Sequence, residues 1–206
     1  MGLLNNILSK FLPIRDERML ELGREIERLK AENEHLRESS IKVNTNKEIP
    51  IKFYDENIED IIIDTIRRAK NEICIAMAYF TSDILIDELY RAKDKGVNIK
   101  VIIDNNDKNI NSKLRIANVC SIFRIAKVSP KYKNIMHNKY CVIDNKIVID
   151  GSYNWSKTAK YNEEHIIIVE ANEIAEMYMK NFNKIFNNSR YYANYDIYEN
   201  VVWKKL

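Results

Sequence analysis

Apolar residues in the N-terminal part of the chain recur with helical rather than extended spacing. Over residues 15–40 they alternate between spacings of three and four, among flanks rich in Glu, Lys and Arg, at Met19, Leu22, Ile26, Leu29, Asn33 and Leu36. This spacing predicts a coiled-coil dimerisation helix, in which Asn33 at a core position favours two strands in fixed register. An amphipathic helix lying on its own domain is the alternative.

Residues 1–14 form a separate, short amphipathic segment. One helical face gathers its apolar side chains, Leu3, Leu4, Ile7, Leu8 and Phe11. The segment is too short to span a bilayer and lacks the cationic start and cleavage site of a secretion signal. Packing on protein and contact with a membrane surface both remain open. The expected location is the cytoplasm, with peripheral attachment to a membrane as a further option.

After a polar linker over residues 41–50, the pattern becomes that of a compact α/β domain over residues 51–190. The expected strands cover residues 51–54, 72–79, 97–104, 121–128, 139–144, 146–150 and 164–170, and helices lie between 57 and 69, 82 and 95, and 172 and 188. The strand–helix–strand unit over residues 72–104 is a parallel crossover. The sequence therefore predicts a mixed, largely parallel sheet flanked by helices. The tail over residues 191–206 is rich in aromatic residues and receives no assignment.

Composition narrows the class of protein. The chain has 206 residues, of which 46% are hydrophobic and 31% charged, and its net charge is +3. It is apolar enough for a real core and too charged for a membrane bundle. Its three Cys residues are widely spaced, so no disulfide framework or zinc site is expected. We expect them to be buried and reduced.

Chemistry-bearing residues gather late in the domain. His137 and Lys139 stand two apart at the entry to a strand, so their side chains share a face and suit a phosphate group. Asp144 follows and is either a hairpin turn residue or a catalytic one.

Gly151 then marks a tight backbone approach. Ser152 and Asn154 can donate hydrogen bonds to phosphate oxygens. Glu164 is a candidate partner for the second ring nitrogen of His137.

Together these residues resemble a known signature. His137-Asn138-Lys139, Asp144, Gly151-Ser152 and Asn154, at these spacings, resemble the HKD motif of the phospholipase D superfamily. Asn162-Glu163-Glu164 is similar to the Asn-x-Glu of its small bacterial nuclease branch. AMAYFTSDILIDELYRAKDKGVNIKVIID resembles the first half of that branch. The resemblance covers about residues 51–190, and it implies a phospholipase D-like fold.

The resemblance implies a metal-independent phosphodiesterase that works through a covalent phosphohistidine, without a cofactor. His137 is then the nucleophile, Lys139, Ser152 and Asn154 bind phosphate, Glu164 orients the imidazole, and Asp144 completes the motif. The mechanism needs a second His as general acid, and the chain holds one copy of the motif. We therefore expect a homodimer with one site at the two-fold axis.

Positive charge around the motif points to a polyanionic substrate. No Asp or Glu interrupts the basic residues Lys108, Lys113, Arg115, Arg124, Lys127, Lys131, Lys133 and Lys139. Candidate nucleic-acid contacts are Lys131, Lys133, Lys157 and Trp155, although Trp155 fits a core position equally well. A nuclease is the leading interpretation.

The alternatives are an ordinary solvated basic face, a hydrolase acting on an anionic membrane lipid such as cardiolipin, and a catalytically silent scaffold.

Overall fold

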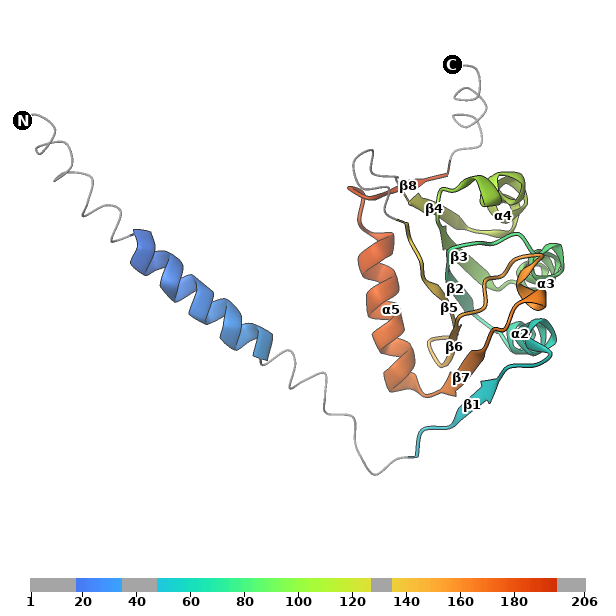
Figure 1. The fold of residues 1–206 in the computed structure, drawn as a ribbon, viewed down its shortest axis with the longest axis horizontal. Helices are drawn as coiled ribbons and strands as arrows, with labels where there is room; N and C mark the ends of the chain where they lie inside the picture. The colour runs from blue at the N-terminus through green and yellow to red at the C-terminus, as the bar shows by residue number, and fades with distance from the viewer. Residues whose placement is uncertain (1–17, 35–47, 127–134, 196–206) are drawn as a thin grey trace, which may run out of the picture. The chain divides into compact units, whose positions relative to one another are not determined.

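The structure is a computed structural model that describes residues 18–34, 48–126 and 135–195, in two units that divide after Glu48. In the first unit a helix runs over residues 18–34 (Figure 1). The apolar residues Met19, Leu22, Ile26 and Leu29 are 48–65% exposed on this helix. The helical part of the coiled-coil prediction is therefore confirmed where it is described. Residues 1–14 and both ends of the predicted helix lie outside the described residues.

The second unit is built on one sheet. Its strands are β1 (Ile51–Tyr54), β2 (Glu72–Met77), β3 (Asn98–Ile103), β4 (Ile122–Ala126), β5 (Lys139–Ile143), β6 (Ile147–Gly151), β7 (Ile166–Glu170) and β8 (Tyr192–Asn194). They lie in the order β1-β7-β6-β5-β2-β3-β4-β8. The predicted strands are confirmed to within a few residues.

The direction of the strands differs from the prediction. Parallel pairing joins β2 to β3 and β3 to β4, and the remaining pairings among the described strands are antiparallel. A mixed sheet flanked by helices is confirmed, but the expectation that it is largely parallel was wrong. The tight turn between β5 and β6 permits only antiparallel pairing, whereas parallel pairing needs a long crossover. Other antiparallel pairs, such as β1 with β7, join strands far apart in the chain, so only the fold sets their direction.

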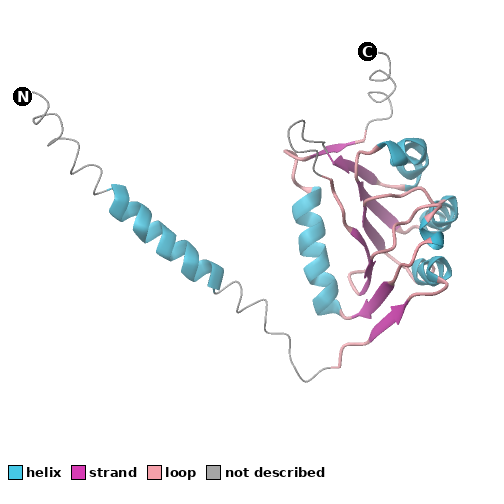
Figure 2. Cartoon of the chain, in the orientation of Figure 1, coloured by secondary structure: helices cyan, strands magenta, loops and turns pink. Residues whose placement is uncertain are grey.

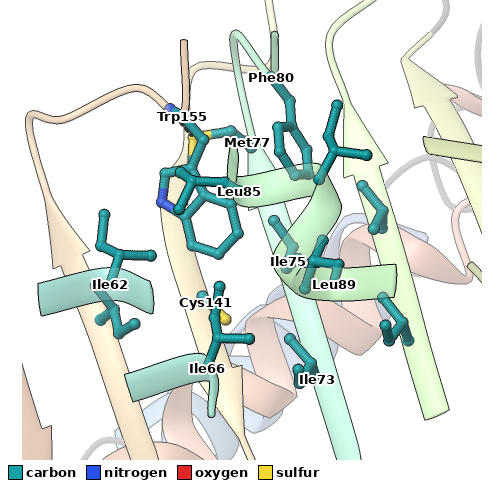
Figure 3. Close-up of a cluster of buried hydrophobic side chains, with 14 of the residues drawn as sticks. Ile62, Ile66, Ile73, Ile75, Met77, Phe80, Leu85, Leu89, Cys141 and Trp155 are labelled. Atoms are coloured by element: carbon teal, nitrogen blue, oxygen red, sulfur yellow. Dashed lines mark hydrogen bonds between the residues drawn. The ribbon is translucent and has the colours of Figure 1, made fainter. Parts of the chain in front are cut away.

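Helices cover both faces of the sheet (Figures 1 and 2). On one face lie α2 (Ile58–Ile66), α3 (Asp83–Asp94) and α4 (Lys113–Val119), and on the other lies α5 (Asn172–Phe186). Between the sheet and α2 and α3, apolar side chains form the larger core, which includes Ile62, Leu85 and Cys141 (Figure 3). The three Cys residues are free thiols; Cys74 and Cys141 are buried as predicted, whereas Cys120 is only partly buried.

Some elements carry too weak a pattern to be foreseen. These are α4, the short 3-10 helices η1 (Asp107–Ser112) and η2 (Ala159–Tyr161), and β8. Strand β8 pairs with β4, with Arg124 opposite Asn194 and Ala126 opposite Tyr192. The domain therefore extends past residue 190, the end predicted from the sequence.

Three backbone positions, at the two ends of β6, fix the geometry around this strand. Asp144 and Asn145 have φ of 52° and 50°, and they form the tight turn between β5 and β6. At the other end of β6, a Cβ on Gly151 would lie 2.2 Å from the carbonyl oxygen of His165 and 2.8 Å from the Cα of Ile166. Only glycine lets β6 and β7 approach this closely, which confirms the tight approach predicted at Gly151.

Gly151→Ala is therefore expected to push β7 away from β6. We expect it to lower the free energy of unfolding by about 2–3 kcal/mol, measured by chemical denaturation. The control is Gly23→Ala in the other unit, where nothing lies within 4 Å of the added Cβ. Equal stability of the two variants would contradict this account of Gly151.

Candidate active site

Most of the predicted catalytic and phosphate-binding residues lie at one end of the sheet. The register places Met77 beside Lys139, and Gly151 beside Ile166. Just before β5, the carbonyl oxygen of Asn138 accepts a hydrogen bond from the backbone N–H of Ala78, at 2.8 Å. The segments that carry His137 and Ser152 therefore leave neighbouring strands at the same edge.

His137 and Lys139 are in contact, as their spacing predicts. The Nζ atom of Lys139 lies 3.3 Å from Nδ1 and 3.2 Å from Nε2 of His137, and it donates to the His137 carbonyl oxygen at 3.0 Å. Burial lowers the pKa of Lys139, while Glu164 and Asp150 act in the opposite direction. A cation and an exposed imidazole thus share one small volume.

Ser152 and Asn154 are oriented by backbone groups of other strands. The Ser152 Oγ accepts from the backbone N–H of His165 at 3.1 Å, and the Asn154 Oδ1 accepts from that of Tyr79 at 3.3 Å. An acceptor is therefore occupied on each side chain. The hydroxyl proton of Ser152 and the amide N–H groups of Asn154 remain as donors. Together with the Lys139 ammonium, they make a set of donors suited to an anion.

Glu164 is near the site, but its partner differs from the prediction. Its Oε1 accepts a hydrogen bond from Nδ2 of Asn162 at 3.1 Å. Within the described part of the chain, this carboxylate bonds Asn162 rather than the His137 ring. Its effect on the pKa of Lys139 shows that it belongs to the same electrostatic environment.

Asp144 lies at the opposite end of β5 from His137. Its carboxylate accepts from the backbone N–H groups of Lys70, Asn71 and Glu72 at 2.8–2.9 Å. Burial alone would raise the pKa of Asp144, but these three hydrogen bonds bring it below its usual value. The structure thus favours the turn-residue alternative, and it does not bring Asp144 together with the other predicted catalytic residues.

Asp104 and Asn109 support the site and were missed in the sequence. Asp104, 2% exposed at the end of β3, accepts from the backbone N–H of Met136 at 2.8 Å, directly before His137. Asn109 is fully buried and bonds the backbone of Ala78, Phe80 and Asp104. A carboxylate at the carboxyl end of a buried strand was the signal for Asp104, whereas Asn109 had none.

A groove of about 510 Å³ opens beside Asn154. Tyr79, Lys108 and Lys157 line it, together with hydroxyl and amide side chains, and Lys108 lies 4.5 Å from the centre of the Tyr79 ring. Lys157 is 62% exposed and pairs with Asp83 at 2.6 Å. The groove thus combines positive charge with an aromatic ring.

The other predicted nucleic-acid contacts are Trp155, Lys131 and Lys133. Trp155 is only 2% exposed and packs edge-on against Phe80 in the core (Figure 3), so its assignment as a contact was wrong. Lys131 and Lys133 lie outside the described residues. Arg115, in the same basic stretch, pairs with Asp83 and Asp87, so part of this charge is used within the fold.

The described residues offer neither a cluster of metal ligands nor a membrane-spanning helix. They contain no group of three or more His, Cys, Asp or Glu side chains placed to hold a metal ion. Nor do they contain a helix with the length and apolar character needed to cross a bilayer.

Comparison with known proteins identifies the family. Residues 62–186 match the sequence family described as "Cardiolipin synthase, PLD-like domain". This match covers more than half of the chain, so the chain belongs to the family of phospholipase D-like domains. It is related to proteins named as hydrolases of this superfamily, and the predicted superfamily is thereby confirmed.

Individual relatives agree with this. A protein named phospholipase D from Rickettsia felis is 36% identical over 123 residues, which are 59% of this chain and 60% of that protein. The human mitochondrial cardiolipin hydrolase is 27% identical over 129 residues, 60% of this chain and 49% of that protein. The chain therefore matches about half to three fifths of the length of these relatives.

Among solved structures, the fold is similar to that of Nuc, a phospholipase D family member from Salmonella typhimurium. The TM-score is 0.62 at 24% identity, over 72% of this chain and 97% of Nuc. NucT from Helicobacter pylori gives a TM-score of 0.58 at 22% identity, over 68% of this chain and 97% of NucT.

The three backbone hydrogen bonds of Asp144 give a pH-dependent prediction. Because the pKa of Asp144 is lower in the folded chain, its ionised form stabilises the fold above the unfolded-state pKa of about 3.9. This contribution is lost as the pH falls through the lower, folded-state value. Asp144→Asn, which tolerates the positive φ, is expected to cost about 1–3 kcal/mol of unfolding free energy at pH 7.

Chemical denaturation of both proteins across pH 7 to pH 3 measures the effect, with Asp94→Asn on the exposed end of α3 as the control. The difference between Asp144→Asn and wild type should narrow in acid. A difference that stays constant with pH would contradict the role of the Asp144 charge.

Proposed function

We propose that this chain is a metal-independent phosphodiesterase that cleaves nucleic acid through a covalent phosphohistidine. The observation that carries the proposal is that Lys139 contacts His137, while Ser152 and Asn154 follow the neighbouring strand at the same end of the sheet. Each presents hydrogen-bond donors, while the acceptors of Ser152 and Asn154 are occupied by backbone groups. A phosphodiester, which has acceptors only and a negative charge, complements such a set.

In the proposed mechanism, a ring nitrogen of His137 attacks phosphorus, and the bond from phosphorus to the leaving oxygen breaks. A second histidine gives its proton to that oxygen. Water then attacks the phosphohistidine, returns a proton to the second histidine, and releases the phosphate from His137. Lys139, Ser152 and Asn154 stabilise the negative charge that develops on the phosphate oxygens.

The second histidine comes, in this proposal, from another copy of the chain. His35 and His165 are the remaining His residues, and neither stands in a second copy of the motif. The His165 ring stacks on Phe53 at 5.6 Å between centres. The exposed apolar stripe of the helix over residues 18–34 offers the surface through which two copies can pair.

The groove beside Asn154 favours nucleic acid as the substrate. Lys108 can contact backbone phosphates, and Tyr79 offers a ring on which a base can stack. Lys157 would have to exchange its ion pair with Asp83 for a phosphate contact. The described residues that line this groove carry mostly hydroxyl and amide side chains, and they include the acidic residue Asp83.

The second candidate is a phosphatidyl hydrolase. The observation in its favour is that relatives are named phospholipase D and cardiolipin hydrolase. The same His–Lys centre serves either phosphodiester, so the substrate is decided by what binds beside it.

One panel of substrates separates these proposals. It contains single- and double-stranded DNA, RNA, and vesicles of phosphatidylcholine or cardiolipin, all in excess EDTA. We expect cleavage of nucleic acid by wild type, and a loss of about 10³-fold or more in His137→Ala. The control is His165→Ala, because the His165 imidazole contacts Phe53 and only its backbone touches Ser152.

Release of phosphatidic acid with intact nucleic acid would assign the chain to the lipid branch. Activity that requires a divalent metal and survives in His137→Ala would overturn the proposed mechanism.

Lys139→Ala tests the phosphate-binding role. Removing the ammonium that lies beside the His137 ring is expected to lower turnover by about 10²-fold or more, without changing the oligomeric state. Lys95→Ala, at the exposed end of α3, is the control. Near-normal turnover of Lys139→Ala would refute this role.

A double variant, Leu22→Glu with Leu29→Glu, tests the dimer. Charges on the apolar stripe should weaken pairing of the helices, so dimerisation and turnover should fall together in sedimentation and activity measurements. Leu20→Glu is the matched control, because Leu20 is 62% exposed but lies off the stripe. An unchanged, active dimer in the double variant would make the helix dispensable.

A further inference from the structure

A second hollow, here called the acidic pocket, lies between the start of α2 and the 153–164 segment. Its volume is about 280 Å³. Four carboxylate side chains line it, and Lys160 is the single basic residue among its described lining residues; the carboxylates belong to Asp55, Glu59, Asp60 and Glu164. This charge repels phosphate, so the acidic pocket is not an extension of the anion site around Lys139.

The wall of the acidic pocket includes Tyr153, whose buried hydroxyl has no hydrogen-bond partner among the described residues. Tyr153 lines the acidic pocket and is only 3% exposed. Its Oη makes no hydrogen bond within the described residues. Burial raises the pKa of Tyr153 to about 12, and Glu59 and Glu164 add to this, so the hydroxyl keeps its proton at neutral pH. Leaving a buried hydroxyl without a hydrogen bond costs about 1–3 kcal/mol, so a ligand that forms this bond gains free energy.

The needs of the fold explain only part of this cluster. Glu59 and Asp60 lie in the first turn of α2, where negative charge is favourable, and Glu59 accepts from the Ser82 hydroxyl at 2.8 Å. Neither role involves Tyr153 or Glu164, which come from the other wall. The described contacts therefore give no structural reason for the carboxylates of α2 to lie beside Tyr153 and Glu164.

We propose that the acidic pocket binds a primary ammonium group. An ammonium carries three N–H donors and no acceptor, and it complements carboxylate oxygens together with a lone pair of the Tyr153 Oη. The phenol can then donate its own hydrogen to a neighbouring carboxylate. A volume of about 280 Å³ suits an alkylammonium.

The acidic pocket shares side chains with the candidate active site. Glu164 lines it and also acts on the pKa of Lys139. Asn162 lines both the acidic pocket and the groove beside Asn154, and it holds Glu164 at 3.1 Å. A bound ammonium neutralises part of the Glu164 charge, and it therefore alters turnover. This consequence rests on the proposed function, whereas binding itself does not.

Calorimetry with the full-length protein at about 0.15 M ionic strength tests binding directly, without any assay of activity. The probe is butylammonium chloride, and the comparison is tetramethylammonium, which has the same charge but no N–H donor. A second arm distinguishes a free amine from a lipid headgroup. It compares vesicles of phosphatidylcholine with and without phosphatidylethanolamine, because only the ethanolamine headgroup carries N–H donors.

Tyr153→Phe removes only the hydroxyl, and it is expected to weaken butylammonium binding roughly tenfold. Because that hydroxyl makes no hydrogen bond to the described residues, the variant should melt no lower than wild type. The matched control is Tyr161→Phe, where the side chain is 78% exposed and outside the acidic pocket. Asp60→Asn, on the exposed rim, provides a second binding variant that does not depend on the Tyr153 substitution.

Saturable binding of butylammonium that weakens in Tyr153→Phe and Asp60→Asn, but not in Tyr161→Phe, would support the proposal. Absence of binding, equal binding of tetramethylammonium, or affinity unchanged in both pocket variants would overturn it. If wild type cleaves no nucleic acid in the substrate panel but still binds butylammonium, the proposed nuclease function is refuted and the ammonium site is supported.

Discussion

The close approach of β6 to β7 at Gly151 is the constraint on which the candidate active site depends. A side chain at this position would collide with the backbone of His165 and Ile166. Because the two strands lie so close, the backbone N–H of His165 reaches the Ser152 hydroxyl. The same segment of β6 then continues to Asn154, whose amide oxygen is held by Tyr79 beyond the end of β2. One glycine thus helps to set the position of two donors at the end of the sheet where His137 lies.

Hydrogen bonds to backbone groups, one of them made by the buried Asp104 carboxylate, position the residues of this site. Asp104 holds the N–H of Met136, and the N–H of Ala78 holds the carbonyl oxygen of Asn138, on either side of His137. Such contacts are short-ranged and directional, so they fix positions without neutralising Lys139. The positive charge of Lys139 therefore remains available for a phosphate group.

The Glu164 carboxylate is close enough to Lys139 to affect its pKa, but its hydrogen bond is with Asn162. Glu164 stands between the anion-binding donors and the acidic pocket, and Asn162 holds its carboxylate in place. The proposed anion and ammonium sites share this carboxylate, so they would be coupled by charge, because a cation beside Glu164 changes the field at Lys139. The short segment between Trp155 and Glu164 thereby links the two hollows in a single electrostatic system.

Local information in the sequence determined most elements and the identity of the central residues. Strand and helix periodicities located β2, α3, β3 and α5, and the spacing of His137 and Lys139 placed them on one face. Such patterns depend on neighbours within a few residues, so they can be read without the fold. The tight backbone approach at Gly151 was also foreseen, in a chain with only four Gly residues.

Tertiary structure alone decided what depends on segments far apart in the chain. Asp144 meets backbone N–H groups more than 70 residues earlier in the chain, so its role in the turn was visible only in the fold. Burial of Trp155 against Phe80, the antiparallel majority of the sheet and the pairing of β8 with β4 have the same origin. The fold likewise brings the buried hydroxyl of Tyr153, which has no hydrogen-bond partner among the described residues, beside carboxylates from α2.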